Sequence, residues 1–205
     1  MGIDSLLPAG TEELTKLLHF SALIDRMTQI LRRNLLVDGS RRENDAEHSW
    51  HIAVMAILFE KYAPENTDIG RVCKMCIVHD LVEIYAGDTF AYDIEGNKDK
   101  EQREKAAADR LFRELPDELN KEIRGLWEEF DAMETVDAKY ASCMDRLQPL
   151  LHNSLTEGHT WKINGKTPRW QLEERMKIVK DTIPELTSWI NACFDEGVKK
   201  GWVTE

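Results

Sequence analysis

Two long apolar segments constrain the fold of this chain more than any other feature. Residues 51–59 (HIAVMAILF) are apolar around almost the whole circumference of a helix, and the predicted helix runs from Asn44 or Asp45 to Tyr62. A second predicted helix, residues 68–85, has apolar side chains at helical spacing. Because a helix that is apolar all round has to be buried, both segments predict central helices that other helices cover.

The rest of the chain also follows a helical pattern. Further helices are predicted at residues 11–33, 98–115, 116–130, 133–153, 168–182 and 184–199, with a break at 38–40 and loops at 88–98 and 154–167. Strand-like alternation is absent beyond noise, and no Pro-, Gly- or Ser-rich linker divides the sequence. A chain of 205 residues can bury one sizeable core. We therefore expect an all-α fold, a single compact helical bundle that forms one domain over residues 1–205.

The charge balance limits the partners. With 27 basic and 38 acidic residues the net charge is −11, which argues against broad binding to nucleic-acid polymers or to an acidic membrane surface. No stretch of 18 apolar residues suggests a membrane span. A small anionic substrate stays compatible with this charge if the chain provides a local positive centre, and a bound metal ion is one way to provide it.

The cysteines indicate a reducing compartment, so we expect a cytoplasmic protein. The four cysteines are few for this length and lie in helix-like or apolar stretches, which does not suggest a disulfide framework. Cys73 and Cys76 have the spacing of half a zinc site or of a redox pair. The second half of a zinc site is missing, and we favour a core position for both.

The informative anomaly is a set of polar residues in the most apolar helices. His48 opens the first, His79 and Asp80 lie in the second, and Asp145 lies in the apolar stretch 136–150. Buried groups of this kind must be paired, hydrogen-bonded or coordinated. Two imidazoles and two carboxylates form a suitable N₂O₂ set for a divalent metal. Core histidines, and an ordinary ion pair between Asp145 and Arg146, are the structural alternatives.

Three segments around these residues resemble a known family. The pattern H…HD…D is similar to the signature of HD-domain metal-dependent phosphohydrolases, in particular 5′-deoxynucleotidases and related predicted HD hydrolases. The resemblance covers about residues 20–175, with the helices at 168–199 packed on that region. It is carried by residues 43–49 (ENDAEHS), by residues 79–88, which contain HDLVE followed by AGD, and by residues 145–153 (DRLQPLLHN). It implies an HD-type helical domain, a divalent metal ion (Mn, Co, Mg, Fe, Ni or Zn) and a homodimer.

The resemblance also implies roles for individual residues. His48, His79, Asp80 and Asp145 match the metal ligands. Glu83 matches an acidic residue that orients or activates the attacking water, and Asp88 matches an acidic position close to the substrate.

The arginine that contacts phosphate is the weakest match. Arg33 falls at the family position, but Asn34 follows it where the deoxynucleotidases have tryptophan. Arg41 is a second candidate for binding substrate and Arg42 a third, although both also fit a solvated basic turn.

These expectations converge on hydrolysis of a small phosphate ester, with a nucleoside 5′-monophosphate as the favoured substrate. Deoxynucleoside triphosphates, cyclic nucleotides and alarmones are alternatives within the same chemistry. His51 and His152 are candidate ligands of a second metal, with packing at a helix boundary as the structural alternative. Outside phosphate-ester hydrolysis, a non-catalytic regulator that binds a metal or a nucleotide is an alternative function. A helical interaction module stays open too, built on residues 98–130 and on tryptophans such as Trp161 and Trp170.

Overall fold

The computed structural model describes residues 10–93, 95–163 and 165–205, so residues 1–9, 94 and 164 of the predicted domain lie outside the described part. Its helices are α1 (Glu12–Ile24), α2 (Asp45–Leu58), α3 (Ile69–Val78), α4 (Glu83–Ala86), α5 (Lys100–Phe112), α6 (Asp117–Ala132), α7 (Val136–Leu155), α8 (His159–Ile163), α9 (Arg169–Thr182) and α10 (Thr187–Lys199). Its short strands are β1 (Leu31–Leu35), β2 (Arg42–Asn44), β3 (Thr167–Pro168) and β4 (Val203–Thr204).

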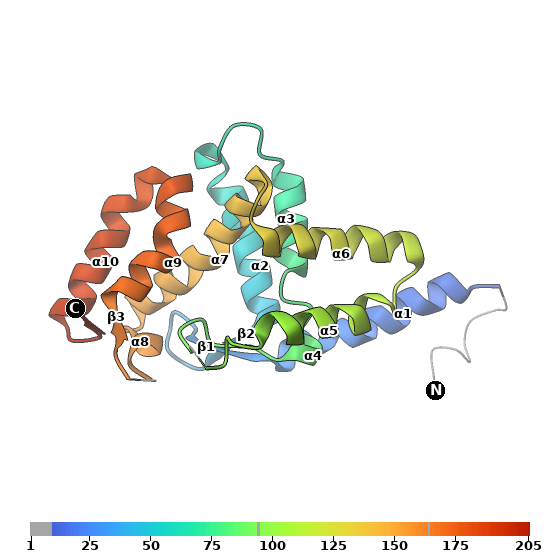
Figure 1. Ribbon diagram of the computed structural model, residues 1–205, viewed down its shortest axis with the longest axis horizontal. Coiled ribbons are helices and arrows are strands. Elements are labelled where there is room, and N and C mark those ends of the chain that lie inside the picture. Colours follow the sequence, from blue (N-terminus) through green and yellow to red (C-terminus); the bar gives the residue numbers. More distant parts are fainter. Residues whose placement is uncertain (1–9, 94, 164) are drawn as a thin grey trace.

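Helices α2, α3 and α7 form the centre of the molecule, and the apolar pattern predicts this position for α2 and α3. α2 packs against both α3 and α7, with α5 and α6 on one side and α9 and α10 on the other (Figure 1). Ile52, Met75 and Tyr140, one from each central helix, are completely buried. The buried Tyr140 hydroxyl donates to the Ala56 carbonyl at 3.0 Å, so the polar group has a partner.

The start of α2 is fixed by local chemistry. The Asn44 side chain accepts from the backbone N–H of Glu47 at 3.0 Å, and the Glu47 carboxylate accepts from the backbone N–H of Asn44 at 3.1 Å. This capping box satisfies N–H groups that the first turn leaves without helical partners. It sets the register of α2, and therefore the side of the helix on which His48 lies.

The prediction of a helix over residues 11–33 and of no strands is wrong for the segment before α2. α1 ends at Ile24, a 3₁₀ helix covers Asp25–Gln29, and β1 pairs antiparallel with β2. The predicted break at 38–40 is the turn of this hairpin, where Gly39 has φ +71° and Ser40 donates its N–H to the Asp38 side chain. Pairing with β2 overrides the helical periodicity and places Arg32 and Arg33 on a strand.

The prediction of one continuous helix over residues 68–85 is also wrong. α3 ends at Val78, and α4 begins at Glu83 after a tight turn that contains His79 and Asp80. In this turn Leu81 donates to Val78 and Glu83 to Asp80, which are three-residue rather than four-residue spacings. Gly87 follows α4 with φ +76°, at the predicted helix end.

The predicted loop at residues 154–167 contains a short helix, α8, and the first residue of β3, which pairs parallel with β4 near the C-terminus. Trp161 of α8 is only 2% exposed, so it is a packing residue. Gly158 has φ +62°, and an added Cβ would lie 2.7 Å from the Trp202 side chain, which explains the glycine.

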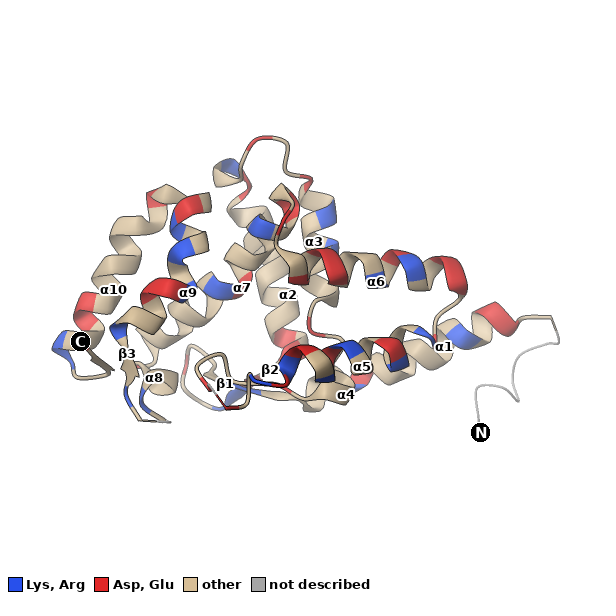
Figure 2. Cartoon of the chain, viewed as in Figure 1, with Lys and Arg blue, Asp and Glu red and all other residues tan. Residues whose placement is uncertain are grey.

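The outer helices carry the charges. In Figure 2, α5, α6, α9 and α10 show acidic and basic residues side by side, whereas α2 shows few. No helix in the described part of the chain is long and apolar enough to cross a membrane. Cys73 is partly buried, Cys76 and Cys143 are completely buried, and all four cysteines, including Cys193, are free thiols.

Candidate functional site

The structure brings the four predicted metal ligands together from three elements. His48 comes from α2, His79 and Asp80 from the turn after α3, and Asp145 from α7. His48 Nε2 lies 3.1 Å from Asp145 Oδ1 and 3.9 Å from Asp80 Oδ2. His79 Nε2 lies 2.9 Å from Asp80 Oδ2 and 3.7 Å from Asp145 Oδ1. Two imidazole nitrogens and two carboxylate oxygens therefore face one another.

Both imidazole rings are oriented by hydrogen bonds at Nδ1, the nitrogen that does not face the carboxylates. His48 Nδ1 donates to Gln148 Oε1 at 3.2 Å, and His79 Nδ1 donates to the Cys76 carbonyl at 2.9 Å. Because the Nδ1 atoms make these hydrogen bonds, the Nε2 atoms of both rings face the carboxylates of Asp80 and Asp145. Such outer partners fix the tautomer and the ring orientation of histidines that bind metals.

The residues fit a divalent cation. The donor atoms of His48, His79 and Asp145 lie within 4.8 Å of one another. The buried His79 Nε2 makes no well-aligned hydrogen bond within the described residues, despite its short distance to Asp80. The carboxylates of Asp80 and Asp145 outweigh the burial of His79 and raise its pKa to about 10. The cluster therefore attracts positive charge, and its N and O donors suit transition metals.

Arg32 is a site residue that the sequence pattern does not identify. Its Nη1 donates to Asp80 Oδ2 at 2.7 Å and lies 3.4 Å from Asp45 Oδ1, and its Nε lies 3.9 Å from Glu43 Oε2. Burial opposes its charge, but Asp80, Asp45 and Asp145 more than offset this and raise the pKa of Arg32. Arg32 therefore holds the same Asp80 oxygen that faces His79, and it neutralises part of the acidic cluster.

Glu83 lies at the same acidic cluster, deep in the protein. Burial first, and then the negative charges of Asp80 and Asp45, raise the pKa of Glu83 well above its ordinary value. Burial and Asp80 likewise raise the pKa of Asp45 to about 7. Burial and neighbouring negative charge thus make both carboxylates stronger proton acceptors than an exposed one. Asp45 was not predicted, although its spacing of three residues before His48 places both on one helix face.

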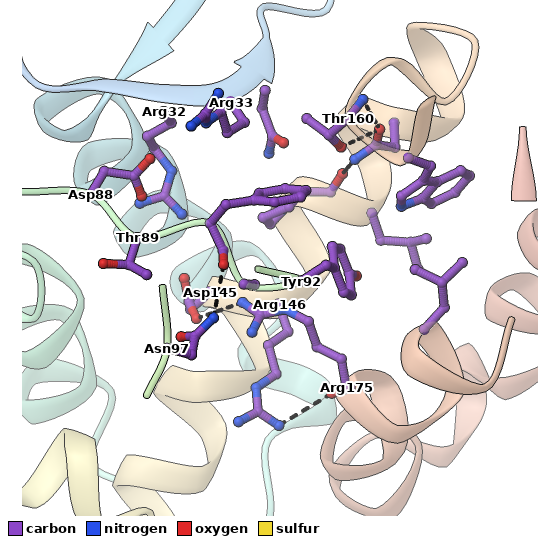
Figure 3. A pocket seen from close by; sticks show the side chains of 18 of the residues that line it. Arg32, Arg33, Asp88, Thr89, Tyr92, Asn97, Asp145, Arg146, Thr160 and Arg175 are labelled. Carbon is purple, nitrogen blue, oxygen red and sulfur yellow. Dashed lines mark hydrogen bonds and ion pairs between the residues drawn. The ribbon is translucent and has the colours of Figure 1, made fainter. Parts of the chain in front are cut away.

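A pocket opens beside these residues (Figure 3). Asp80, Asp145 and Glu83 lie in its wall together with the predicted substrate residues Asp88 and Arg33. The histidine side chains are 0% and 3% exposed, whereas those of Asp80 and Asp145 are 14% and 17% exposed. The carboxylate side of the cluster therefore faces the pocket.

The structure does not bring Arg41 to this pocket. Its guanidinium is half exposed and pairs with both oxygens of Glu47, at 2.5 and 3.0 Å. Arg42 turns back on the hairpin, where its Nε donates to the Arg32 carbonyl. Both side chains have partners that explain their positions without a substrate.

His51 and His152, considered as ligands of a second metal, lie together with Glu43. Donor atoms of these three residues lie within 4.8 Å of one another. Between them is the Gln148 amide, whose Nε2 is 2.5 Å from Glu43 Oε1, 3.1 Å from His152 Nε2 and 3.3 Å from His51 Nδ1. The two N–H groups of this amide can donate to two of these three acceptors at a time, and the contacts hold the Gln148 side chain that orients His48.

Comparison with known proteins places this geometry in context. A family model described as HD domain matches residues 24–187. The Xenopus laevis protein named 5′-deoxynucleotidase HDDC2 is 27% identical, over 88% of this chain and 87% of its own. The human protein of the same name is also 27% identical, over 67% of each chain.

Solved structures of phosphohydrolases are also similar to this chain. The crystal structure of a predicted metal-dependent phosphohydrolase from Magnetospirillum magnetotacticum is 46% identical, with a TM-score of 0.90 over 97% of this chain and 99% of that one. An HD-domain phosphohydrolase from Listeria innocua is 17% identical, with a TM-score of 0.57 over 90% and 86% of the two chains, which bears on the fold alone. The helical architecture is thus shared well beyond close sequence similarity.

Proposed function

Because the chain belongs to the HD domain family, whose model matches residues 24–187, we propose that this phosphohydrolase acts on nucleoside 5′-monophosphates. The observation that carries the proposal is the convergence of His48, His79, Asp80 and Asp145 on one point beside a pocket. The names of the Xenopus and human relatives, both 5′-deoxynucleotidases, support the choice of substrate. The predicted all-α fold of HD type is confirmed by the same comparison.

The four converging residues would hold a divalent cation, one of Mn, Co, Mg, Fe, Ni or Zn. Their donor set of two imidazoles and two carboxylates supports this assignment. When bound, such an ion supplies Lewis acidity, which polarises a phosphoryl oxygen and makes water more acidic. The protein contributes fixed donors: Gln148 and the Cys76 carbonyl orient the rings, and Arg32 holds Asp80.

Glu83 is the proposed group that positions and deprotonates the attacking water. Its Oε2 atom is buried without a hydrogen-bond partner among the described residues, and its pKa is raised by burial and by Asp80. A carboxylate with these properties is suited to general base catalysis. Asp88, whose pKa burial also raises, lies in the pocket wall where it can accept hydrogen bonds from the substrate.

Arg33 is the proposed phosphate contact from the hairpin. It lies in the pocket wall with Asp88, whose charge it faces. A guanidinium offers several N–H donors to the oxygens of a phosphate group. Arg41 is left out of the proposed site, because its guanidinium pairs with Glu47 instead.

The biological setting is proposed from simpler features. The net charge of −11 supports a small phosphorylated substrate rather than a nucleic-acid polymer or a membrane surface. The four free thiols support a reducing compartment such as the cytoplasm. Exposed apolar side chains on α2 and α3, among them Trp50, Ile57 and Ile77, support a homodimer.

The experiment that tests the function is direct. Purified protein loaded with Mn²⁺, Co²⁺ or Mg²⁺ is assayed against ribo- and deoxynucleoside 5′-monophosphates and a generic aryl phosphate. Release of inorganic phosphate is expected with at least one metal, and His79→Ala should abolish it. No turnover with any metal, or wild-type turnover in His79→Ala, would contradict the proposal.

Glu83 separates an enzyme from a non-catalytic metal-binding regulator. Replacing Glu83 with Gln preserves its size but removes the basic oxygen, so we expect kcat to fall by about 10²–10⁴-fold. Metal affinity, measured by calorimetry, should stay within a few fold of wild type. A structural metal site has no need of such a group, so unchanged turnover in Glu83→Gln would remove the proposed role.

A further inference from the structure

Two arginines that the function above does not use lie in the wall of the pocket. Arg146 comes from α7 and Arg175 from α9, and both share the pocket with Asp80 and Asp145 (Figure 3). The same arginines, together with Tyr92, also border an adjoining outer cavity. They therefore lie where the cavity beside the acidic cluster continues toward the surface.

Arg146 has no acidic partner within ion-pair distance in the described part of the chain. Its Nη1 donates to the Arg175 carbonyl at 3.2 Å, and its Nη2 lies 3.1 Å from Met133 Sδ. The Arg146 side chain is partly buried, and the second cation, Arg175, lies beside it. A partly buried cation beside a second cation is unfavourable unless an anion compensates it.

Arg175 is only weakly compensated. Its Nη2 lies 3.6 Å from Asp145 Oδ2, while Oδ1 of the same carboxylate lies 3.1 Å from His48 Nε2. Asp145 is therefore shared between the arginine and the proposed metal ligands. Two guanidinium groups thus depend on one carboxylate that has another role, and positive charge is left over at the pocket wall.

We propose that Arg146 and Arg175 form an anion subsite that binds phosphoryl oxygens of the substrate. The inference rests on the proposed function and adds two binding residues from the C-terminal part of the chain to Arg33. A phosphoryl group supplies the negative charge that the protein lacks here, and paired guanidiniums match its oxygens with several donors. The Tyr92 hydroxyl lies in the same wall, and the charges of both arginines act on it.

The phosphoryl group that binds here is either the one that is cleaved or a second one on the same substrate. Because Arg175 contacts Asp145, it lies next to the proposed metal ligands, within reach of the phosphoryl group that is cleaved. Because both arginines also border the outer cavity, a second phosphoryl group on the same substrate could bind there. In both cases the subsite recognises a phosphoryl group.

The test uses metal-loaded protein and inorganic phosphate as the probe, at constant ionic strength. Phosphate binding is measured by calorimetry and by the rise in Tm, since a ligand that binds the folded state stabilises it. We expect Arg146→Gln and Arg175→Gln to weaken phosphate binding by at least about tenfold, the loss of one charge-assisted contact. Arg169→Gln, on α9 but paired with Glu173 and Asp195, is the matched control and should bind phosphate as wild type does.

Stability distinguishes a subsite from a structural role. Without phosphate, Arg146→Gln should have a Tm equal to or above wild type, because it removes a charge without a counter-ion; a structural arginine would lower it. Metal titrations verify that the ligands of both variants are intact. Arg175→Lys, which keeps the charge but not the guanidinium donors, should bind phosphate more tightly than Arg175→Gln and less tightly than wild type. Absence of phosphate binding to wild type, or wild-type affinity in both glutamine variants, overturns the subsite.

Nucleotide assays separate this inference from the proposed function. If KM for monophosphates rises in the variants, the subsite binds the scissile group; if only nucleoside 3′,5′-bisphosphates are affected, it binds a second group. Hydrolysis with wild-type KM for both substrates would leave the function standing and remove the subsite. If phosphate binding depends on the two arginines but no nucleotide is hydrolysed, the subsite stands and the proposed function is removed.

Discussion

His48 Nδ1 lies 3.2 Å from Oε1 of Gln148, a residue that follows it by 100 positions. The opposite end of the same amide donates to Glu43 at 2.5 Å and faces His152 at 3.1 Å. Gln148 therefore cannot turn over without losing these acceptors, and its oxygen stays directed at the imidazole. The orientation of His48 is decided by a group of buried polar residues outside the pocket.

Replacing Gln148 with Leu should weaken metal binding by about 10–100-fold, the usual cost of removing an outer hydrogen bond to a ligand. The side chain volume is nearly kept, but His48 loses the acceptor that fixes its tautomer. Calorimetric titration with Mn²⁺ measures the effect. Lys139→Gln, on the same helix and exposed, is the control. An unchanged affinity in Gln148→Leu would show that α2 packing alone orients the ring.

Removing the metal should lower the stability of wild type but not of His79→Ala. Binding to the folded state contributes about 2.7 kcal/mol at a free metal concentration 100 times Kd. Tm is measured with added metal and with a chelator. We expect a drop of several degrees in wild type and little change in the variant, and equal drops in both would contradict His79 as a ligand.

The buried His152 should make the protein sensitive to mild acid. Burial, and then the neighbouring His51, lower the pKa of His152 to about 4, against 6.5 for an exposed group. Since the unfolded chain takes up this proton more readily, the neutral His152 contributes stability at neutral pH that is lost as pH falls from about 6.5 toward 4.

Denaturant unfolding of wild type and His152→Gln tests this pH dependence. The glutamine oxygen can still accept from Gln148, but it does not titrate. Between pH 7 and 4.5 wild type should lose about 1–2 kcal/mol more stability than the variant. Parallel pH profiles would show that His152 stays neutral in both states or is charged in both.

Trp50→Glu should produce a monomer if the apolar face of α2 and α3 is the dimer interface. Trp50 is 66% exposed, so the change does not disturb the core, and a buried unpaired carboxylate is incompatible with an apolar interface. Light scattering after gel filtration measures the mass. Leu155→Glu, exposed at the end of α7, should leave the mass unchanged. A monomeric wild type would remove the proposed dimer.

The sequence by itself predicted two of the three central helices and nominated the four residues that converge. Apolar periodicity reports which face of a helix is buried, and it identified α2 and α3 as central. Polar residues within apolar stretches, together with the resemblance to HD-domain segments, then singled out His48, His79, Asp80 and Asp145. It failed at residues 31–35 and at the turn of 79–82, because strand pairing and three-residue hydrogen bonds override local pattern there.

Only the tertiary structure decided which other charges share the site. Arg32 contacts Asp80, which is 48 residues away in the sequence, and Gln148 contacts Glu43, which is 105 residues away. Arg175 of α9 contacts Asp145 of α7. None of these contacts can be predicted from the local sequence. The pattern of apolar residues around a charged or amide residue is the same whichever partner that residue contacts in the folded protein. Periodicity therefore locates the buried ligands, but the packing of separate elements determines what surrounds them.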